Sequence, residues 1–297
     1  MSWIFYIFLS VNFFAIANLT DKFLVSKKFK SIYSLAVVLN ILYLIFNIIL
    51  GFFIWKTVLF GWPFFWAVLA SAFYYLMWIF WLKALQTGEI SRLSAIFFTQ
   101  PIFIALLAMI FLKESVMPIK WLAIIIIVIG AILSSWENKK TKTGFNSAYI
   151  FILLSTIFSS IGNVVSKHAM TAMPALTVQV IGYFVALPFF LILLINKQVF
   201  LEVKKTFSNL KFTSFLFLRS LVGYVGICLF MLAIGAGPVA FVSALSATQP
   251  IAIFICSTLL SFFAPKIIKE ETTKGALFTK AVAIILIVTG TIILSLF

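Results

Sequence analysis

Hydrophobic residues fall in long continuous runs separated by short clusters of charged residues, proline and glycine. A run of about 20 apolar residues is what an α-helix needs to cross the hydrocarbon core of a bilayer. Membrane-spanning barrel strands would instead alternate apolar and polar positions, and these runs do not alternate. The pattern therefore predicts ten spanning helices, at 3–20, 32–54, 64–86, 92–112, 116–135, 147–168, 174–196, 212–234, 239–264 and 278–297. The longest polar stretches, about 196–211 and 264–277, are expected to be loops, because they are too short to fold as domains.

The composition agrees with a polytopic all-α membrane protein. Of the 297 residues, 64% are hydrophobic and 10% are charged, where soluble domains have roughly 45–50% and 25%. A water-soluble fold needs a polar exterior, so a soluble enzyme, a secreted disulfide scaffold and a disordered chain are all excluded. The two cysteines, Cys228 and Cys256, both lie inside apolar runs.

The charges are strongly asymmetric, with 22 Lys and Arg against 7 Asp and Glu. In a soluble protein this excess would suggest nucleic acid, but here the lysines cluster between the apolar runs, as cytoplasmic anchors do, and we expect no nucleic-acid partner. The odd-numbered loops carry 17 of these cations and the even-numbered loops 4. The positive-inside rule then places the odd loops in the cytoplasm and both termini outside.

The two halves of the chain resemble each other. Thr99-Gln100-Pro101 recurs 149 residues later as Thr248-Gln249-Pro250. At the same offset the chain pairs Tyr75 with Tyr224, Ala84 with Ala233, Gly88 with Gly237, Ser94 with Ser243 and Ala95 with Ala244. Further on, Pro101 to Gly130 spans 29 residues and Pro250 to Gly290 spans 40. We expect the extra residues in the loop Pro265–Lys274.

This duplication predicts two five-helix repeats, residues 1–140 and 147–297. Because five is odd, the second repeat enters the membrane from the opposite side, and the two repeats are inverted. Inverted repeats are common in secondary transporters, whose substrate site lies near the midplane between the halves.

Several of these residues resemble a known family. Ala84-Leu85-Gln86-x-Gly88, Gln100-Pro101, Leu112-Lys113-Glu114 and Ile129-Gly130 look like the EamA-type repeat of the drug/metabolite transporter superfamily. The segment from Asn18 to Leu24 is similar to first helices of that group. The resemblance implies ten helices, a central cavity, and export or uptake of small metabolites. It also implies both termini inside, against the charge count, so the orientation stays open.

The repeated Thr-Gln-Pro triplets are the first candidate site. Proline frees a backbone carbonyl one turn earlier, and glutamine offers donors and an acceptor. If the repeats are related by a two-fold axis, Thr99, Gln100, Thr248 and Gln249 could converge on one substrate, with Pro101 and Pro250 kinking their helices. The alternative is a kinked helix whose glutamine binds a neighbouring helix.

Other polar residues in the runs have similar double interpretations. Asn18 and Asn163 line the vestibules or cap helix ends. Tyr75 and Tyr224 form an aromatic wall or are ordinary core tyrosines. Arg219 binds a carboxylate or phosphate of the substrate, or extends its side chain to the nearer membrane surface. The carboxylates all fall at loops or predicted helix ends, which argues against a proton relay.

Together these features predict a secondary transporter in a bacterial or archaeal inner membrane. The expected partners are a small-molecule substrate, with amino acids or their derivatives leading, and the lipid bilayer, and the expected state is a monomer or homodimer. No metal, cofactor or catalytic constellation is expected, so an enzyme is the least favoured class. A flippase for lipids or lipid-linked sugars on the same architecture is the alternative.

Overall fold

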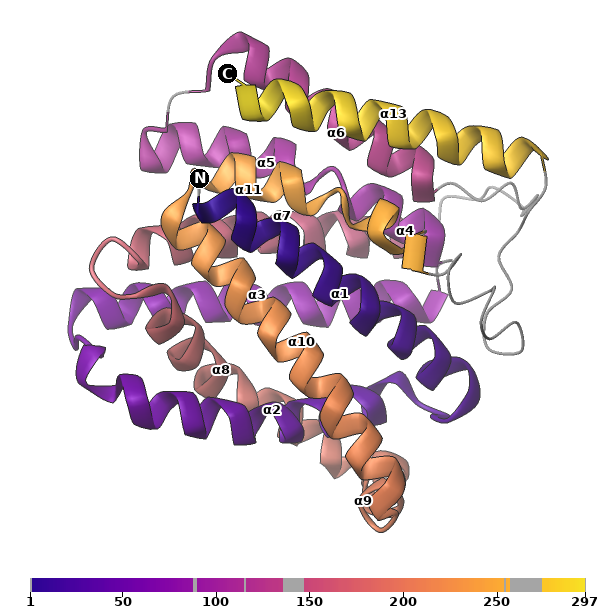
Figure 1. Ribbon diagram of the computed structural model, residues 1–297. Coiled ribbons are helices and arrows are strands. Elements are labelled where there is room, and N and C mark those ends of the chain that lie inside the picture. Colours follow the sequence, from indigo (N-terminus) through magenta and orange to yellow (C-terminus); the bar gives the residue numbers. More distant parts are fainter. Residues whose placement is uncertain are drawn as a thin grey trace.

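The computed structural model describes residues 2–87, 90–114, 116–135, 147–253, 255–256 and 274–296, and within these ranges the regular structure is helical, with no strand. Within the described residues, seven helical spans are long and apolar enough to cross a membrane by length and composition, and one of them, Leu93–Leu112, consists of consecutive helical segments. Three shorter apolar spans lie at Pro118–Leu133, Val239–Ile253 and Ala281–Ile293. The elements, shown in Figure 1, are α1 (Ser2–Lys27), α2 (Ile32–Ile54), η1 (Trp55–Thr57), α3 (Trp62–Thr87), α4 (Ile90–Phe97), α5 (Gln100–Leu107), η2 (Ala108–Leu112), α6 (Pro118–Ser135), α7 (Ser147–Ala169), α8 (Ala175–Ile192), η3 (Leu193–Ile195), α9 (Lys197–Phe207), α10 (Leu210–Ala236), α11 (Val239–Ser246) and α13 (Lys274–Leu296).

Several helix bounds follow the sequence pattern closely. Helix α2 begins and ends at the predicted residues, and the Ser31 side chain caps it by accepting a hydrogen bond from the Tyr33 amide at 3.2 Å. Helix α1 is longer than predicted and continues through the polar residues after position 20 to Lys27. The prediction ended at residue 20, before the charged residues that follow, but in the fold the Asp21 carboxylate is paired with Arg219.

The segment 196–211, expected to be a loop, contains the helix α9 instead. The Asn196 side chain caps it by accepting hydrogen bonds from the amides of Gln198 and Val199. Val199, Val203 and Thr206 are buried, at the spacing of one helix face. The search for apolar runs long enough to span a bilayer missed this helix because it is short and amphipathic.

Two segments predicted as continuous helices are broken in the middle. In 92–112, α4 ends at Phe97 and α5 begins at Gln100. In 239–264, α11 ends at Ser246, and helix resumes at residue 249. The second segment is described only as far as residue 256, and most of the loop Pro265–Lys274 lies outside the described residues.

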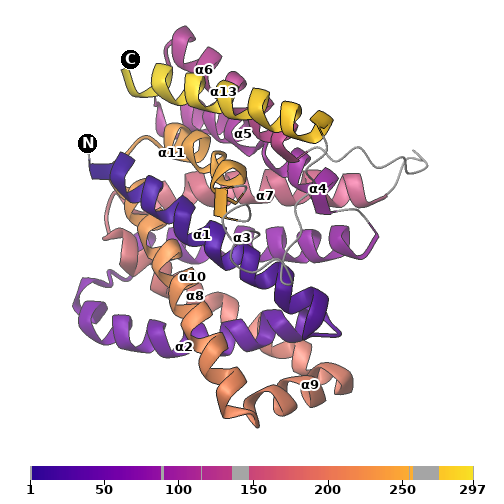
Figure 2. The same ribbon diagram turned by 45° about the vertical axis from the view of Figure 1, so that its right-hand side comes forward.

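The helices form one bundle in which partners come from different halves of the sequence. Helix α3 packs along α7 and α1 packs along α10, while α6 and α13 lie side by side at one edge. Helices α2, α8 and α9 lie on the opposite edge, and the two chain ends lie at the same end of the bundle in both views (Figures 1 and 2).

The pair α6 and α13 crosses at two glycines. A Cβ atom on Gly130 would lie 2.6 Å from Cγ1 of Ile287 and 2.9 Å from the carbonyl oxygen of Ala283. A Cβ atom on Gly290 would meet Cγ1 of Ile127 and the carbonyl oxygen of Ala123 at these same two distances. Each glycine therefore lets the backbone of the other helix approach closely.

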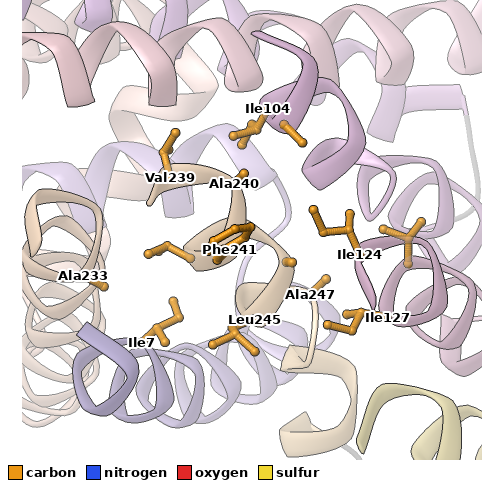
Figure 3. Packing of buried hydrophobic residues seen from close by; sticks show 14 of the residues in the cluster. Ile7, Ile104, Ile124, Ile127, Ala233, Val239, Ala240, Phe241, Leu245 and Ala247 are labelled. Atoms are coloured by element: carbon orange, nitrogen blue, oxygen red, sulfur yellow. The ribbon is translucent and has the colours of Figure 1, made fainter. Parts of the chain in front are cut away.

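The largest hydrophobic cluster surrounds α11. Figure 3 shows Phe241 and Leu245 of α11 between Ile7 of α1 on one side and Ile124 and Ile127 of α6 on the other. Small residues of α11, among them Ala240 and Ala244, are fully buried, so neighbouring helices pack close to its backbone. The broken helix is thus held at the centre of the bundle.

Candidate functional site

The two Thr-Gln-Pro triplets form the two helix breaks. At the first, the Thr99 hydroxyl donates to the carbonyl of Ile96 at 2.7 Å, and at the second, the Thr248 hydroxyl donates to the carbonyl of Leu245 at 2.7 Å. The backbone turns also match, since the Thr99 amide donates to Ile96 and the Thr248 amide to Leu245. Both threonine hydroxyls therefore hold the ends of the first half-helices. The triplets were expected within continuous kinked helices, whereas the structure places Pro101 and Pro250 in the first turns of new helical segments.

The first glutamine reaches a polar face of α7. Gln100 donates from Nε2 to the Ser159 hydroxyl at 2.7 Å. Around this contact α7 carries a buried polar stripe along about half of its length: Ser155, Thr156, Ser159, Ser160, Asn163 and Ser166. Gln249, at the second break, is partly buried.

The two candidate asparagines, Asn18 and Asn163, have different surroundings. Asn163 is 2% exposed, and its Nδ2 donates to the Ser159 carbonyl at 2.8 Å. Its Oδ1 is buried without a hydrogen-bond partner among the described residues. A buried acceptor without a partner costs free energy, and it is available to a donor on a bound molecule. Asn18 is exposed, so the two asparagines do not form a matched pair of vestibule groups in this conformation.

Arg219 forms an ion pair inside the bundle. Its Nε donates to Oδ1 of Asp21 at 2.6 Å, and its Nη2 donates to Oδ2, so the carboxylate is held by two hydrogen bonds. Its Nη1 donates to the Tyr43 hydroxyl at 2.8 Å. The Arg219 side chain is 7% exposed and the Asp21 side chain 27%. Arg219 therefore neither snorkels to the surface nor stands unpaired, and the ion pair joins α1, α2 and α10.

Gly223 makes room for this ion pair. It lies one turn beyond Arg219 on α10, and a Cβ atom there would lie 2.5 Å from the Tyr43 hydroxyl oxygen and 2.8 Å from Nη1 of Arg219. Any larger residue would push the tyrosine and the guanidinium apart.

A second polar group continues from the ion pair toward α8. Asn47 is fully buried, and its Oδ1 accepts hydrogen bonds from Nε2 of Gln179 and from the Tyr224 hydroxyl, both at 3.1 Å. Its Nδ2 donates to the carbonyl of Tyr43 at 2.9 Å. Tyr224 is therefore part of a network with the ion pair, whereas Tyr75 stacks on Phe189 with ring centroids 3.7 Å apart. The two tyrosines do not form one aromatic wall.

At the C-terminal end of α10 a lysine side chain binds backbone carbonyls. Lys167, in the last turn of α7, donates from Nζ to the carbonyls of Ile234 at 2.8 Å, Gly235 at 3.0 Å and Gly237 at 2.9 Å. This Lys167 cap satisfies carbonyls at the end of α10, which attract a cation. Beside it, Oε1 of Glu114 accepts a hydrogen bond from the Val239 amide at 3.3 Å, at the start of α11. Residues 219 and 235 are 16 positions apart, so the ion pair and the Lys167 cap lie about 24 Å apart along α10.

One cavity adjoins the polar network. It has a volume of about 610 Å³ and is lined by residues of α2, η1, α3 and α8. Asn47 and Thr177 are polar lining residues, and most of the others are aliphatic or aromatic. The volume is within the range of about 300–1,000 Å³ that is usual for small-molecule sites.

The chemistry of these groups is hydrogen bonding and charge pairing. The residues described here contain no group of three or more His, Cys, Asp or Glu side chains that could hold a metal ion. The sequence pattern identified Arg219 and Tyr224 but not Asp21 as the partner of Arg219, nor Tyr43, Asn47 and Gln179. The signal for Asn47 and Gln179 was present, since each is an uncharged polar residue within an apolar run, but a single such residue does not say which helix it faces.

The fold and these polar groups define a multi-pass membrane protein with buried polar contacts between its helices. The sequence profile of the EamA-like transporter family matches residues 1–136 and 146–296. The chain therefore belongs to the EamA-like transporter family, and it is a membrane transporter of the drug/metabolite transporter superfamily.

Two other comparisons add to this result. No curated protein matches the chain. A crystal structure of a protein that shares 17% sequence identity is similar in fold, with a TM-score of 0.70 over 99% of this chain and 96% of that chain. At this identity the likeness concerns the fold alone.

Proposed function

We propose that this protein is a secondary transporter that moves a small metabolite across the membrane by alternating access between two inverted five-helix repeats. The repeats are residues 1–140 and 147–297, the substrate is an amino acid or an amino-acid derivative, and the membrane is a bacterial or archaeal inner membrane. One observation carries the proposal: several contacts between the halves occur twice, with the roles of the halves exchanged.

The hydrogen bonds of two serines are the best example. Ser10 of α1 donates to the carbonyl of Gly226 in α10 at 2.8 Å, and Ser155 of α7 donates to the carbonyl of Met77 in α3 at 3.0 Å. Ser10 and Ser155 differ by 145 positions, as Asn18 and Asn163 do. Met77 and Gly226 differ by 149 positions, as the two Thr-Gln-Pro triplets do. When the two halves are exchanged, each of these hydrogen bonds takes the place of the other, as a two-fold axis requires.

The crossing of α6 and α13 supports the same relation. Gly130 and Gly290 meet partners with the same geometry, and each pair of corresponding residues differs by 160 positions. This offset exceeds 149 by the 11 residues that the second half has gained after its Thr-Gln-Pro triplet. The family profile also matches two stretches whose limits lie close to those of the proposed repeats.

The substrate site in this proposal lies at the breaks. Broken helices in transporters expose backbone groups and polar side chains near the midplane of the membrane. Gln100, Ser159 and Asn163 present such groups at the first break, and Asn163 Oδ1 is a buried acceptor that has no partner within the described part of the chain. Gln249 is expected to face the same space from the second break.

The gates in this proposal are the contacts at the two ends of α10. The ion pair of Asp21, Arg219 and Tyr43 closes one end, and the Lys167 cap with Glu114 closes the other. Alternating access requires that the two contacts open in turn and never at the same time. Both consist of hydrogen bonds that water can replace once the helices separate.

Counterflow in proteoliposomes tests the proposal. A panel of labelled amino acids and other metabolites is offered to the wild type, to the double variant Gln100→Ala/Gln249→Ala and to a control, Gln198→Ala, on the exposed face of α9. We expect the wild type and the control to exchange one class of compound and the double variant to lose this exchange. Exchange by all three proteins would support transport but would show that Gln100 and Gln249 only pack between helices and do not bind the substrate.

The absence of exchange for every water-soluble compound would contradict the proposal. A fluorescent-lipid scrambling assay would then decide whether the flippase alternative holds.

A further inference from the structure

The cavity between α2 and α8 opens on the face of the bundle that the bilayer covers. Its lining includes Ile48, Phe52 and Trp55, whose exposed fractions are 55%, 74% and 63%. These residues lie on a helix that is long and apolar enough to span the membrane. In the membrane protein that the family match establishes, this face meets lipid rather than water.

At position 51, in the lining of the cavity, α2 has no side chain. Gly51 lines the cavity, and a Cβ atom there would meet only Cγ1 of Val180 on α8, at 3.5 Å, which is an ordinary contact. A side chain at position 51 would therefore start in contact with the Val180 side chain and not with backbone. The opposite wall is formed by Val180, Ile181 and Phe184.

The cavity runs along α2 from the membrane interface inward. Trp55 and Trp62 lie at the turn between α2 and α3, where tryptophan marks the level of the lipid headgroups. Asn47 is eight residues before Trp55, and thus about 12 Å deeper along the helix. An elongated apolar molecule with its polar end at Trp55 would fill this shape.

A cation lies at the outer end of the cavity. Lys56 is exposed, and its Nζ lies 5.8 Å from the centroid of the Trp55 ring. A lysine at this level attracts the phosphate of an anionic lipid. We propose that the cavity between α2 and α8 is a binding site for a bilayer lipid with an anionic headgroup, with one acyl chain lying along the cavity beside Gly51 and Val180 and the phosphate at Lys56.

The site would act on the transporter through Asn47. This residue lines the cavity and also accepts the hydrogen bonds of Gln179 and Tyr224. An acyl chain beside Asn47 fills the space next to this network and holds α2 against α8. The proposal does not depend on the identity of the transported substrate.

Native mass spectrometry of the purified protein with phosphatidylglycerol or phosphatidylcholine tests the site. We expect the wild type to retain one phosphatidylglycerol more tightly than phosphatidylcholine. Gly51→Trp, which fills the cavity, should lose the retained lipid, as should Val180→Phe from the opposite wall. Lys56→Gln should bring phosphatidylglycerol down to the level of phosphatidylcholine, a loss of about fivefold for one lysine near the membrane surface.

Two control variants make the test specific. Ile125→Trp places the same large side chain on the exposed face of α6, and Lys197→Gln removes an exposed lysine at the start of α9. Both should retain the lipid as the wild type does, and the melting temperature of every variant shows whether it folds. Equal lipid retention by folded Gly51→Trp or Val180→Phe and the wild type would overturn the proposal. If these two variants retained the lipid and also showed a raised KM for a transported compound, the cavity would hold the substrate and not a lipid, which would equally overturn the proposal.

Discussion

At the scale of single residues, the pairing of Asp21 with Arg219 explains how two charges are kept inside the bundle. Each charge alone would be costly in a membrane-spanning helix. Together they form a two-point ion pair that Tyr43 completes, and Gly223 leaves room for it. Sequence reasoning identified Arg219 but could not find its partner, because 198 positions separate the two residues and only the fold brings α1 to α10.

Removing one partner of this pair should cost more than removing both. Arg219→Gln leaves a carboxylate without its cation, which destabilises proteins by about 3–5 kcal/mol when the site is fully buried. We expect the lower end of this range because the Asp21 side chain is 27% exposed. The double variant Asp21→Asn/Arg219→Gln should be more stable than Arg219→Gln alone. Thermal unfolding in detergent measures the stability of each variant. A double variant whose loss of stability equals the sum of the losses of the two single variants would contradict the prediction.

Gly130 and Gly290 give a second prediction for single residues. Gly130→Ala and Gly290→Ala each bring a Cβ atom within 2.9 Å of a backbone carbonyl, so α6 and α13 must move apart. Overpacking of this kind costs about 1–3 kcal/mol. The two variants should lower the melting temperature by similar amounts. Gly51→Ala, whose new Cβ atom has its nearest neighbour at 3.5 Å, serves as the control and should have little effect.

At the scale of elements, the two broken helices are the most informative feature. The sequence located both breaks through the repeated Thr-Gln-Pro, but it predicted kinked rather than interrupted helices. The difference arises because each threonine hydroxyl binds the carbonyl three residues earlier and ends the first half-helix before proline begins the second. Proline alone does not say whether a helix bends or stops.

Replacing these prolines should slow transport without unfolding the protein. Pro101→Ala and Pro250→Ala restore a backbone amide that can join the two half-helices, which makes the break more rigid. We expect unchanged or higher melting temperatures and exchange rates lower by about tenfold, the effect of about 1.4 kcal/mol on a barrier. Pro188→Ala in the continuous helix α8 is the matched control. An equal slowing by this control would show that the breaks have no special role.

The helix α9 shows the limit of the apolar-run criterion. Apolar runs identify elements that bury all their faces in lipid or protein, and α2 follows this rule to the residue. Helix α9 buries only one face, so it has no apolar run and was taken for a loop. Its cap at Asn196 and the spacing of Val199, Val203 and Thr206 were the signals available in the sequence.

At the scale of the whole molecule, the helical membrane class and the family were predictable because composition and repeated motifs are properties of the sequence. Which helices pack against each other could not be predicted from the sequence. Apolar faces in a membrane are nearly interchangeable, and small residues and hydrogen bonds decide which helices pack together. Gln100 with Ser159, and Asn47 with Gln179 and Tyr224, are such contacts, and none has a sequence signal that names its partner.

Transport by the proposed mechanism requires that the two ends of α10 open in turn. Spin labels at Val25 of α1 and Leu218 of α10 report the ion-pair end, and labels at Thr171 and Ala236 report the Lys167 end, all four positions being exposed. Cys228 and Cys256 are replaced beforehand so that only the chosen positions are labelled. Distances are measured by double electron–electron resonance in proteoliposomes, with and without the compound found by counterflow. The account predicts that one distance increases as the other decreases, and distances that change together, or not at all, during active exchange would contradict it.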